Sequence, residues 1–373
     1  MKVIQILPEL DAGGVERGTL EVAAHLVANG HDAVVISNGG RLVPELTASG
    51  ARHITLPVQR KSLASLWQVG KLRRLLVEER ADILHIRSRV PGWLGLLAWR
   101  GLDPALRPRL VSTVHGFYSV NRYSAVMTMG EAVIAVSESV RDYIHSNYPA
   151  TDHAKIRVIH RGVDETLYHP GHTPPGDWLN SWHAAHPQLA GRIPLLLPGR
   201  LTRWKGQEHF IRLIARLLEL GRPVHGLIVG APHAKKLGFL DELKELAASL
   251  GVAEHVTFLG HRGDLREIMA VSALVYSLST DAEAFGRVSL EALALGKPVV
   301  GYAHGGVAEQ LQVIFPAGMV ALNDEAAVLE TTIEILDQHL TPGPIGPFTL
   351  QRMLDSTLEV YQSLLDRSGR HAP

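Results

Sequence analysis

The sequence has no cysteine among its 373 residues. This absence excludes disulfide scaffolds, thiol nucleophiles and cysteine-based zinc sites, and it suits a reducing compartment such as the cytoplasm. The formal net charge is zero, because Lys+Arg and Asp+Glu both number 37. A chain-wide basic footprint for nucleic acid is therefore absent, and we expect no nucleic-acid partner.

Long apolar runs are absent as well. The longest, at about residues 90–99, is interrupted by Pro91, Gly92 and Gly95. It falls well short of the ~20 residues that a membrane-spanning helix needs. The first ten residues do not resemble an export signal, because their short apolar run soon meets Glu9 and Asp11. These features predict a cytoplasmic protein.

Several catalytic motifs are missing too. The chain has no H-E-x-x-H, no closely spaced aspartates after a strand, no G-x-S-x-G, no Walker A and no G-x-G-x-x-G. We therefore expect no metal site, no nucleophile-elbow hydrolase chemistry and no dinucleotide fingerprint.

What is present is a repeated alternation of strands and helices. A chain of 373 residues exceeds the size at which one core stops growing, so two domains are expected. In the first half, β-branched apolar runs predict buried strands at 3–7, 33–37, 83–86, 110–115, 133–136 and 156–159. Amphipathic patterns predict helices at 15–29, 63–79 and 138–147.

The alternation restarts after a Pro/Gly-rich stretch at 168–177. Strands are predicted at 193–197, 224–229, 256–258, 273–276 and 298–301, with helices at 206–220, 236–250 and 287–295. A second Pro/Gly cluster at 341–347 precedes a last helical pattern at 350–365.

This pattern predicts an α/β protein with two Rossmann-like, doubly wound domains that face a central cleft. The expected domains are residues 1–170 and 171–349, with 350–373 packing back on the first. Open α/β sheets bind ligands at the carboxyl ends of their strands, so the βα loops should carry the chemistry.

Two loops of the first domain are candidates. Gly13 and Gly14 join the first strand to the first helix, where free backbone N–H groups can bind an anion. His115 follows an apolar strand and should face the cleft. The alternatives are a tight turn without ligand for the glycines and a hydrogen-bonded structural role for the histidine.

Two loops of the second domain carry charges. Arg200 and Lys205 lie five residues apart between a strand and a helix, and such cations can converge on a diphosphate. Glu283 lies in a loop, and Glu291 follows within an apolar helix, where a carboxylate needs donors such as a ribose diol. The alternatives are exposed cations on a loop and acids that favour a helix start.

Several motifs occur in one order along the chain. They are Gly13-Gly14-Val-Glu-Arg17, Val158-Ile-His-Arg-Gly162-Val-Asp164, Gly199-Arg-Leu-x-x-x-Lys205-Gly206, Val256-Thr-Phe-Leu-Gly260, Glu283-x7-Glu291 and Gly296-Lys-Pro-Val-Val300-x4-Gly305-Gly306. Together they resemble the retaining GT-B glycosyltransferases of family 4 (group 1), which include lipopolysaccharide-core enzymes. The resemblance spans nearly the whole chain.

The resemblance implies a role for each candidate. Arg200 and Lys205 would hold the donor diphosphate, with Gly13 and Gly14 against the same phosphates. Glu291 would bind the ribose, and His115 would hydrogen-bond the transferred sugar. The set that would hold the donor sugar is Glu283 with Ala284, Phe285, Gly286 and Arg287, and the pair that would border the base is His261 and Arg262.

The implied function is retaining transfer of a sugar from a nucleotide-sugar, with a UDP-sugar as the expected donor, to a glycan or glycolipid such as a lipopolysaccharide core. No cofactor is implied. Arg161 stands where the family usually has Asn, and Arg287 stands where small or apolar residues are common, which leaves the sugar open. The alternatives are a GT-B nucleotide-sugar 2-epimerase, which needs no acceptor, and a catalytically silent nucleotide-binding scaffold.

Residues 60–109 carry an excess of positive charge. They contain 11 Lys/Arg and four acids, which gives 11 − 4 = +7 in a neutral chain, and Trp67, Trp93 and Trp99 are interleaved with them. Such a segment suits an anionic membrane surface at the inner face of the membrane. The alternative is a set of solvated helix faces with tryptophans in the core.

Overall fold

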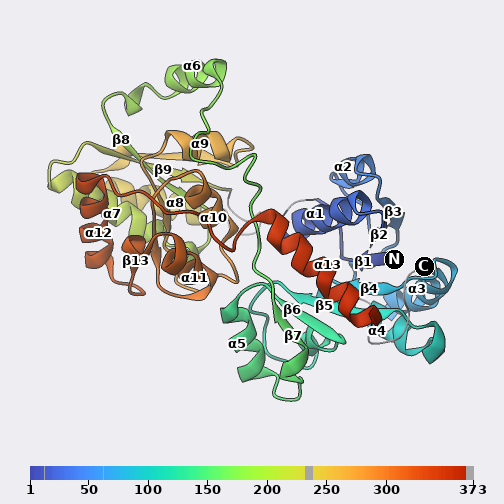
Figure 1. Ribbon diagram of the computed structural model, residues 1–373. Helices are drawn as coiled ribbons and strands as arrows, with labels where there is room; N and C mark the ends of the chain where they lie inside the picture. Colours follow the sequence, from blue (N-terminus) through green and yellow to red (C-terminus); the bar gives the residue numbers. More distant parts are fainter. Residues whose placement is uncertain (12, 62, 232–237, 367–373) are drawn as a thin grey trace. The chain divides into compact units, whose positions relative to one another are not determined.

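The computed structural model describes residues 1–11, 13–61, 63–231 and 238–366, and the chain divides into two compact units. The first unit contains Met1–Arg161 and Gln351–Pro373, and the second contains Gly162–Leu350. Each is a parallel sheet covered by helices (Figure 1). The predicted α/β architecture of two doubly wound units is confirmed. Residues 236–237 of one predicted helix and the tail 367–373 lie outside the described residues.

The sheet of the first unit has the order β3-β2-β1-β4-β5-β6-β7, and every described pairing is parallel. Its strands are β1 (Lys2–Ile6), β2 (Asp32–Ser37), β3 (Arg52–Thr55), β4 (Ile83–Ile86), β5 (Arg109–Val114), β6 (Ala132–Ala135) and β7 (Ile156–Val158). Its helices are α1 (Gly14–Ala28), α2 (Val43–Ala48), α3 (Trp67–Glu78), α4 (Arg89–Arg100), α5 (Glu138–Asn147) and α13 (Leu350–Asp366).

The sheet of the second unit has the order β10-β9-β8-β11-β12-β13, again with parallel pairing. Its strands are β8 (Ile193–Pro198), β9 (Val224–Val229), β10 (Val256–Gly260), β11 (Leu274–Ser277), β12 (Val299–Tyr302) and β13 (Met319–Val320). Its helices are α6 (Gly176–Ala185), α7 (Gln207–Glu219), α8 (Gly238–Ser249), α9 (Leu265–Val271), α10 (Arg287–Ala294), α11 (Gly305–Ile314) and α12 (Glu325–Gln338).

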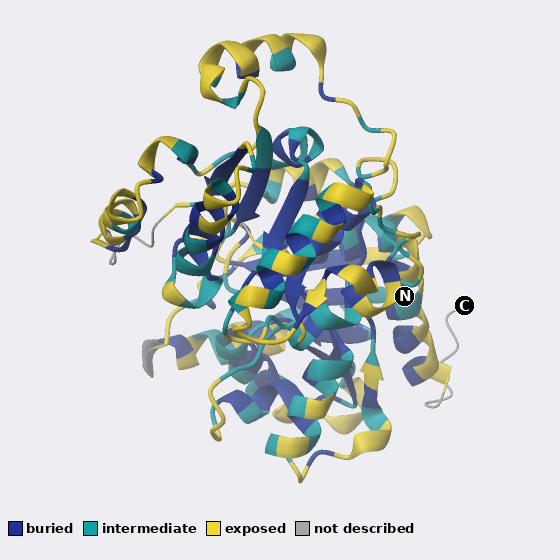
Figure 2. Cartoon of the chain, turned by 90° about the vertical axis from the view of Figure 1, so that its left-hand side faces the viewer, coloured by how far each residue is buried: buried dark blue, intermediate teal, exposed yellow. Residues whose placement is uncertain are grey.

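Burial explains the strand sequences. The central strands β1, β4, β8 and β9 are buried almost throughout, because helices cover both faces of each sheet. Helices such as α7 bury one stripe, here Phe210, Ile211, Ile214 and Leu217, and expose the opposite side. Figure 2 shows the buried strands in dark blue beneath helices with exposed yellow stripes.

The unit boundary differs from the predicted residue 170. It lies after Arg161, because the next residues are already hydrogen-bonded within the second unit. Val163 N–H donates to Phe348 O (3.1 Å), and Leu350 N–H donates to Val163 O (2.9 Å). The last helix, α13, belongs to the first unit, where Tyr361 Oη lies 2.6 Å from His85 Nδ1. Figure 1 shows it in red beside the strands of that unit.

Candidate active site

The second unit builds its site at the switch point of the sheet, where β8 is flanked by β9 and β11. The loop after β8 contains Gly199, Arg200 and Lys205, and the loop after β11 leads to Glu283. The two loops interlock, because the Thr280 N–H donates to the Trp204 carbonyl (2.7 Å).

Gly206 makes this close approach possible. It adopts a left-handed conformation (φ 75°), and a Cβ there would clash with the Leu278 carbonyl. The glycine at this position is therefore required for the packing of the two loops, and it also belongs to the candidate anion site.

Lys205 and Glu283 face each other across these loops. Lys205 Nζ lies 2.8 Å from Glu283 Oε1, and their side chains are 15% and 19% exposed. Ser279 Oγ donates to the same oxygen (2.6 Å), and the Lys205 ammonium also lies over the Trp204 ring (4.5 Å from its centroid). The sequence did not predict this pairing, since it assigns the two residues to different parts of a donor.

Arg200 is exposed and has no carboxylate partner among the described residues. Its carbonyl accepts from buried Gln207 Nε2 (3.0 Å), which fixes the backbone of the loop. The cation itself is available to a ligand.

The loop of Glu283 is supported from behind by α11. The Gly306 N–H donates to Glu283 O (2.8 Å), and a Cβ on Gly306 would overlap the backbone of Phe285. Buried Gln310 donates from Nε2 to Phe285 O (2.5 Å). Sequence reasoning missed Gln310, although a buried amide on an otherwise apolar helix face is a signal for such a contact.

The start of α10 holds Glu291 next to a cation. Arg287 Nε donates to Glu291 Oε1 (3.0 Å) one helical turn away, and the Glu291 side chain is 12% exposed. The unusual residue Arg287 is therefore a partner of the predicted ribose ligand. Gly286 begins the helix with a left-handed backbone (φ 80°), and Phe285 is buried, with Ala284 beside it half-buried.

The predicted base-bordering pair behaves differently. His261 is exposed, whereas Arg262 makes two hydrogen bonds to Asp264, of 2.8 and 2.6 Å. Asp264 also accepts from Trp178 Nε1 (2.7 Å), and these donors lower its pKa, with Arg262 as the main cause. Arg262 is thus held in place by its own unit.

The first unit places Gly13 and Gly14 at the open start of α1. Both are exposed, and a Cβ on Gly14 would have no atom within 4 Å of it. Gly13 has φ 133°, and Glu16 lies against it. Burial raises the pKa of this Glu16 carboxyl. Free N–H groups at this helix start are compatible with the predicted phosphate contact.

His115 follows β5 and is fixed by Arg161. Arg161 Nη2 donates to His115 Nδ1 (2.6 Å), so the neutral ring carries its proton on Nε2. Burial, followed by the charges of Arg161 and Arg87, holds the pKa of His115 well below its usual value. His115 Nε2 is buried and has no hydrogen-bond partner among the described residues. The ring therefore presents one N–H donor for a ligand.

Arg87 is a buried cation at the end of β4. It is 2% exposed, and Nη1 donates to Gln5 Oε1 (2.9 Å). Burial lowers its pKa to about 10. Gly18 of α1 leaves the space for the Arg161 and Arg87 guanidinium groups, because a Cβ there would meet both. Sequence reasoning placed Arg87 on a basic surface, and the structure corrects this.

No group of three or more His, Cys, Asp or Glu that could hold a metal ion occurs in the part of the chain that the structure describes. Within the same part, no helix is long and apolar enough to cross a membrane.

Comparison with known families agrees with this geometry. A family model described as Glycosyltransferase Family 4 matches residues 12–167, and one described as Glycosyl transferases group 1 matches residues 181–338. The chain belongs to the group 1 glycosyltransferases of family 4. The resemblance inferred from the motifs is confirmed, and this glycosyltransferase is an enzyme with the GT-B fold.

Individual relatives are distant. The D-inositol 3-phosphate glycosyltransferase of Mycobacterium marinum is 28% identical over 334 residues, which are 80% of this chain and 67% of that protein. A glycosyltransferase structure from Rickettsia africae is 29% identical, with a TM-score of 0.84 and 98% of both chains covered. Anabaena Alr3699/HepE, solved with UDP and glucose, is 20% identical, with a TM-score of 0.81 over 97% of this chain and 100% of that one.

Proposed function

We propose that this glycosyltransferase moves a sugar from a UDP-sugar to a hydroxyl of a phosphate-bearing glycan or glycolipid, with retention of the anomeric configuration. The observation that carries the proposal is the site at the switch point of the second unit. There Lys205 lies 2.8 Å from Glu283, and Arg200 is exposed beside them.

The residues of this site suit a nucleotide diphosphate sugar. Arg200 and Lys205 would neutralise the diphosphate, and Glu283 would accept hydrogen bonds from sugar hydroxyls. The HepE structure was solved with UDP and glucose, which supports UDP as the nucleotide. Glu291 would accept from the ribose hydroxyls while it keeps its bond to Arg287.

Charge development explains how these side chains accelerate transfer. Breaking the sugar–phosphate bond places negative charge on the leaving diphosphate, and preorganised cations stabilise that charge most in the transition state. His115 would donate from Nε2 to the sugar that is transferred. The departing phosphate would accept the acceptor proton on the same face, so no protein base and no cofactor are assigned.

An anionic acceptor fits the first unit. His115 lies beside the guanidinium of Arg161, and Arg87 is close enough to shift the same ring. The mycobacterial relative is named for a phosphorylated acceptor, D-inositol 3-phosphate. A lipopolysaccharide core, which the resemblance implies, belongs to the same chemical class of phosphate-bearing glycans.

The test is a two-way panel. The protein is incubated with UDP-, GDP- and ADP-sugars, each with inositol phosphate, a phosphorylated lipopolysaccharide core, its dephosphorylated form, or no acceptor. With a UDP-sugar and a phosphorylated acceptor, we expect mass spectrometry to detect a new glycosidic product. NMR should show that the transferred sugar keeps the anomeric configuration that it had in the donor. Donor epimerisation without acceptor, or transfer from GDP-sugars only, would refute the proposal.

We further propose that the enzyme works in the cytoplasm at the inner face of an anionic membrane, through residues 60–109. Fewer cations of this segment are free to contact a membrane than the sequence suggests, because Arg87 is buried and Arg109 pairs with Glu131 (2.6 Å). Trp67 remains 81% exposed. Sedimentation with anionic but not neutral vesicles, weakened by salt and by Arg73→Glu with Arg74→Glu, is the expected result. Equal sedimentation with both vesicles would contradict it.

A further inference from the structure

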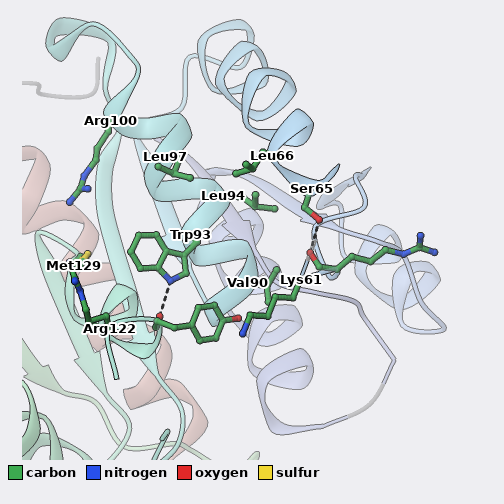
Figure 3. A pocket seen from close by; sticks show the side chains of 13 residues that line it. Lys61, Ser65, Leu66, Val90, Trp93, Leu94, Leu97, Arg100, Arg122 and Met129 are labelled. Atoms are coloured by element: carbon green, nitrogen blue, oxygen red, sulfur yellow. Dashed lines mark hydrogen bonds between the residues drawn. The ribbon is translucent and has the colours of Figure 1, made fainter. Parts of the chain in front are cut away.

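A cavity of about 620 Å³ lies in the first unit beside α4, away from His115. Its volume is within the usual range for small-molecule sites. We call it the α4 cavity. Its walls come from α4, from the chain that enters α3, and from the segment before β6 (Figure 3). No residue of the proposed transfer site lines it.

The cavity exists because α4 is apolar on two sides. One side packs on the sheet, where Gly92 and Gly95 approach Ile86 closely. The other side presents Trp93, Leu94 and Leu97 to the cavity. A helix that is apolar all round is normally buried all round. Here the second face opens onto a space that the described residues leave empty.

The floor and the rim of the cavity differ in chemistry. Figure 3 shows Leu66, Leu94 and Leu97 close together, with Lys61 beside Val90 and with Arg100 and Arg122 beyond Trp93. The Trp93 indole donates a hydrogen bond from Nε1 to Tyr123 O (2.8 Å), which holds in place a ring that lines the cavity. Leu66, which is 50% exposed, lines the same cavity and extends its apolar surface.

Four cations line the rim, and none is paired with a carboxylate in the described part of the chain. They are Arg60, Lys61, Arg100 and Arg122, and all four are exposed. The Lys61 ammonium instead lies 4.4 Å from the centroid of the Tyr123 ring. Among the described residues, no carboxylate lines the cavity. Such a site offers positive charge above an apolar space, which complements an anionic head on an alkyl chain.

We propose that the α4 cavity binds one alkyl chain of a phosphate-bearing membrane lipid, with the phosphate at the cationic rim of the cavity. This inference rests on the proposed membrane association and adds a defined lipid site to it. It differs from a general basic surface, since it requires the chain and the phosphate to bind together.

The cavity is also linked to the transfer site within the first unit. The loop from His115 to Tyr123 joins them, and the His115 N–H donates to Tyr118 Oη (3.2 Å). The Arg89 guanidinium lies over both tyrosine rings, 4.7 Å from the Tyr118 centroid and 5.6 Å from that of Tyr123. A lipid in the cavity would therefore contact the loop that begins at His115.

Calorimetric titration with small soluble probes tests the site without a bilayer. Octyl phosphate, octanol and inorganic phosphate are titrated separately into the full-length protein. We expect octyl phosphate to bind at least tenfold more tightly than either of the other two. Its binding should show a negative heat-capacity change, which marks apolar burial. Equal binding of inorganic phosphate, or no binding of octyl phosphate, would overturn the proposal.

Variants locate the binding. Leu97→Trp fills the cavity and Leu66→Glu places a negative charge at its edge, so each should weaken octyl phosphate at least tenfold. Lys61→Glu with Arg122→Glu should weaken octyl phosphate but not octanol. The matched control is Lys71→Glu, an exposed cation of α3 that does not line the cavity. An equal loss in the control, or no loss in Leu66→Glu, would show that the probe binds elsewhere.

Titration of UDP in the same proteins separates this proposal from the proposed function. The cavity variants should bind UDP as the native protein does. If UDP fails to bind the native protein, the donor assignment is wrong, while octyl phosphate still reports on the cavity. Vesicle sedimentation in turn tests membrane association without identifying the cavity.

Discussion

The two units share one parallel architecture, but they arrange the charges of their loops in opposite ways. In the second unit, Lys205 faces Glu283 and Arg287 faces Glu291, so these two cations are paired before any ligand enters and, within the part of the chain that the structure describes, only Arg200 of the predicted site keeps a free charge. In the first unit, the cations around the α4 cavity have no carboxylate among the described residues, and Arg161 faces an imidazole. A ligand that binds paired cations must replace their carboxylate partners, which favours selective binding. Unpaired cations instead attract any anion from a distance.

The largest expected effect breaks the balance of the second unit. Lys205→Ala removes a proposed diphosphate ligand and would also leave the Glu283 carboxylate without its cation at the proposed phosphate site. We expect a loss of about 3–4 kcal/mol of transition-state stabilisation. Arg200→Ala removes a cation with no carboxylate partner in the described chain and should cost less, about 1.5–3 kcal/mol. Steady-state kinetics with a UDP-sugar measure both.

The matched control is Lys205→Ala combined with Glu283→Gln. It should recover UDP binding relative to Lys205→Ala, because the repulsive carboxylate is gone, but not the rate of transfer. Activity within a few-fold of native for both single variants would remove Arg200 and Lys205 from the site.

Both sheets contain a buried histidine, and each should make the folded protein less stable at acidic pH. His225 in β9 is 1% exposed, with Nε2 2.8 Å from Thr257 Oγ1, and burial lowers its pKa to about 4. The unfolded chain takes up a proton near pH 6.5, which the folded chain does not. Stability is therefore present above pH 6.5 and falls between pH 6.5 and 4, by about 3 kcal/mol from this group.

Urea unfolding at pH 7 and pH 4.5 measures this effect. His225→Gln cannot be protonated and should lose less stability on acidification than the native chain. Burial also lowers the pKa of His85 in β4. The variant His85→Gln therefore extends the comparison to the first unit. An identical pH dependence in native and His225→Gln would contradict the assignment.

A smaller effect is expected from Arg161→Asn. Without this guanidinium the pKa of His115 should rise, although burial, the largest cause of its lowered pKa, and the charge of Arg87 remain. A protonated ring repels the positive charge that develops on the sugar. The variant should therefore lose more activity between pH 8 and pH 6 than the native enzyme loses.

Arg161→Lys keeps the charge and serves as the control for this pH profile. It should follow the native curve more closely than Arg161→Asn does. Parallel profiles for native and Arg161→Asn would show that Arg161 supports the fold without setting the protonation of His115.

The smallest effect is expected from metal removal. Because Arg200 and Lys205 would already neutralise the diphosphate under the proposed function, EDTA should change the transfer rate by less than about twofold. Full loss of activity that Mg²⁺ or Mn²⁺ restores would instead show that the diphosphate is neutralised by a metal.

The sequence predicted the order of most strands, because parallel strands buried on both faces read as continuous apolar runs, but it omitted about half of the helices. It missed β3, a short half-buried strand at the sheet edge. It also missed α4, where Pro91, Gly92 and Gly95 argue against a helix. Pro91 lies in the first turn, where its missing N–H is harmless, and the glycines are needed for contact with Ile86.

The candidate residues were predictable, but their partners were not. Motif order singled out Lys205, Glu283 and His115, since each follows a strand. The contact between Lys205 and Glu283 depends on two loops that meet across the sheet, and that of His115 with Arg161 joins β5 to β7 across β6. Such contacts follow from tertiary packing, which spacing along the chain does not encode.

The return of α13 to the first unit has a consequence for synthesis on the ribosome. The first unit is interrupted after Arg161 and resumes only at Gln351. At about 5–20 residues per second, the 189 residues between them (162–350) take roughly 10–40 s to translate. Until then His85 lacks its Tyr361 partner, and the nascent first unit waits, incomplete, while the second unit can already fold. A chaperone that binds nascent chains would find this part of β4 without its α13 partner during that interval.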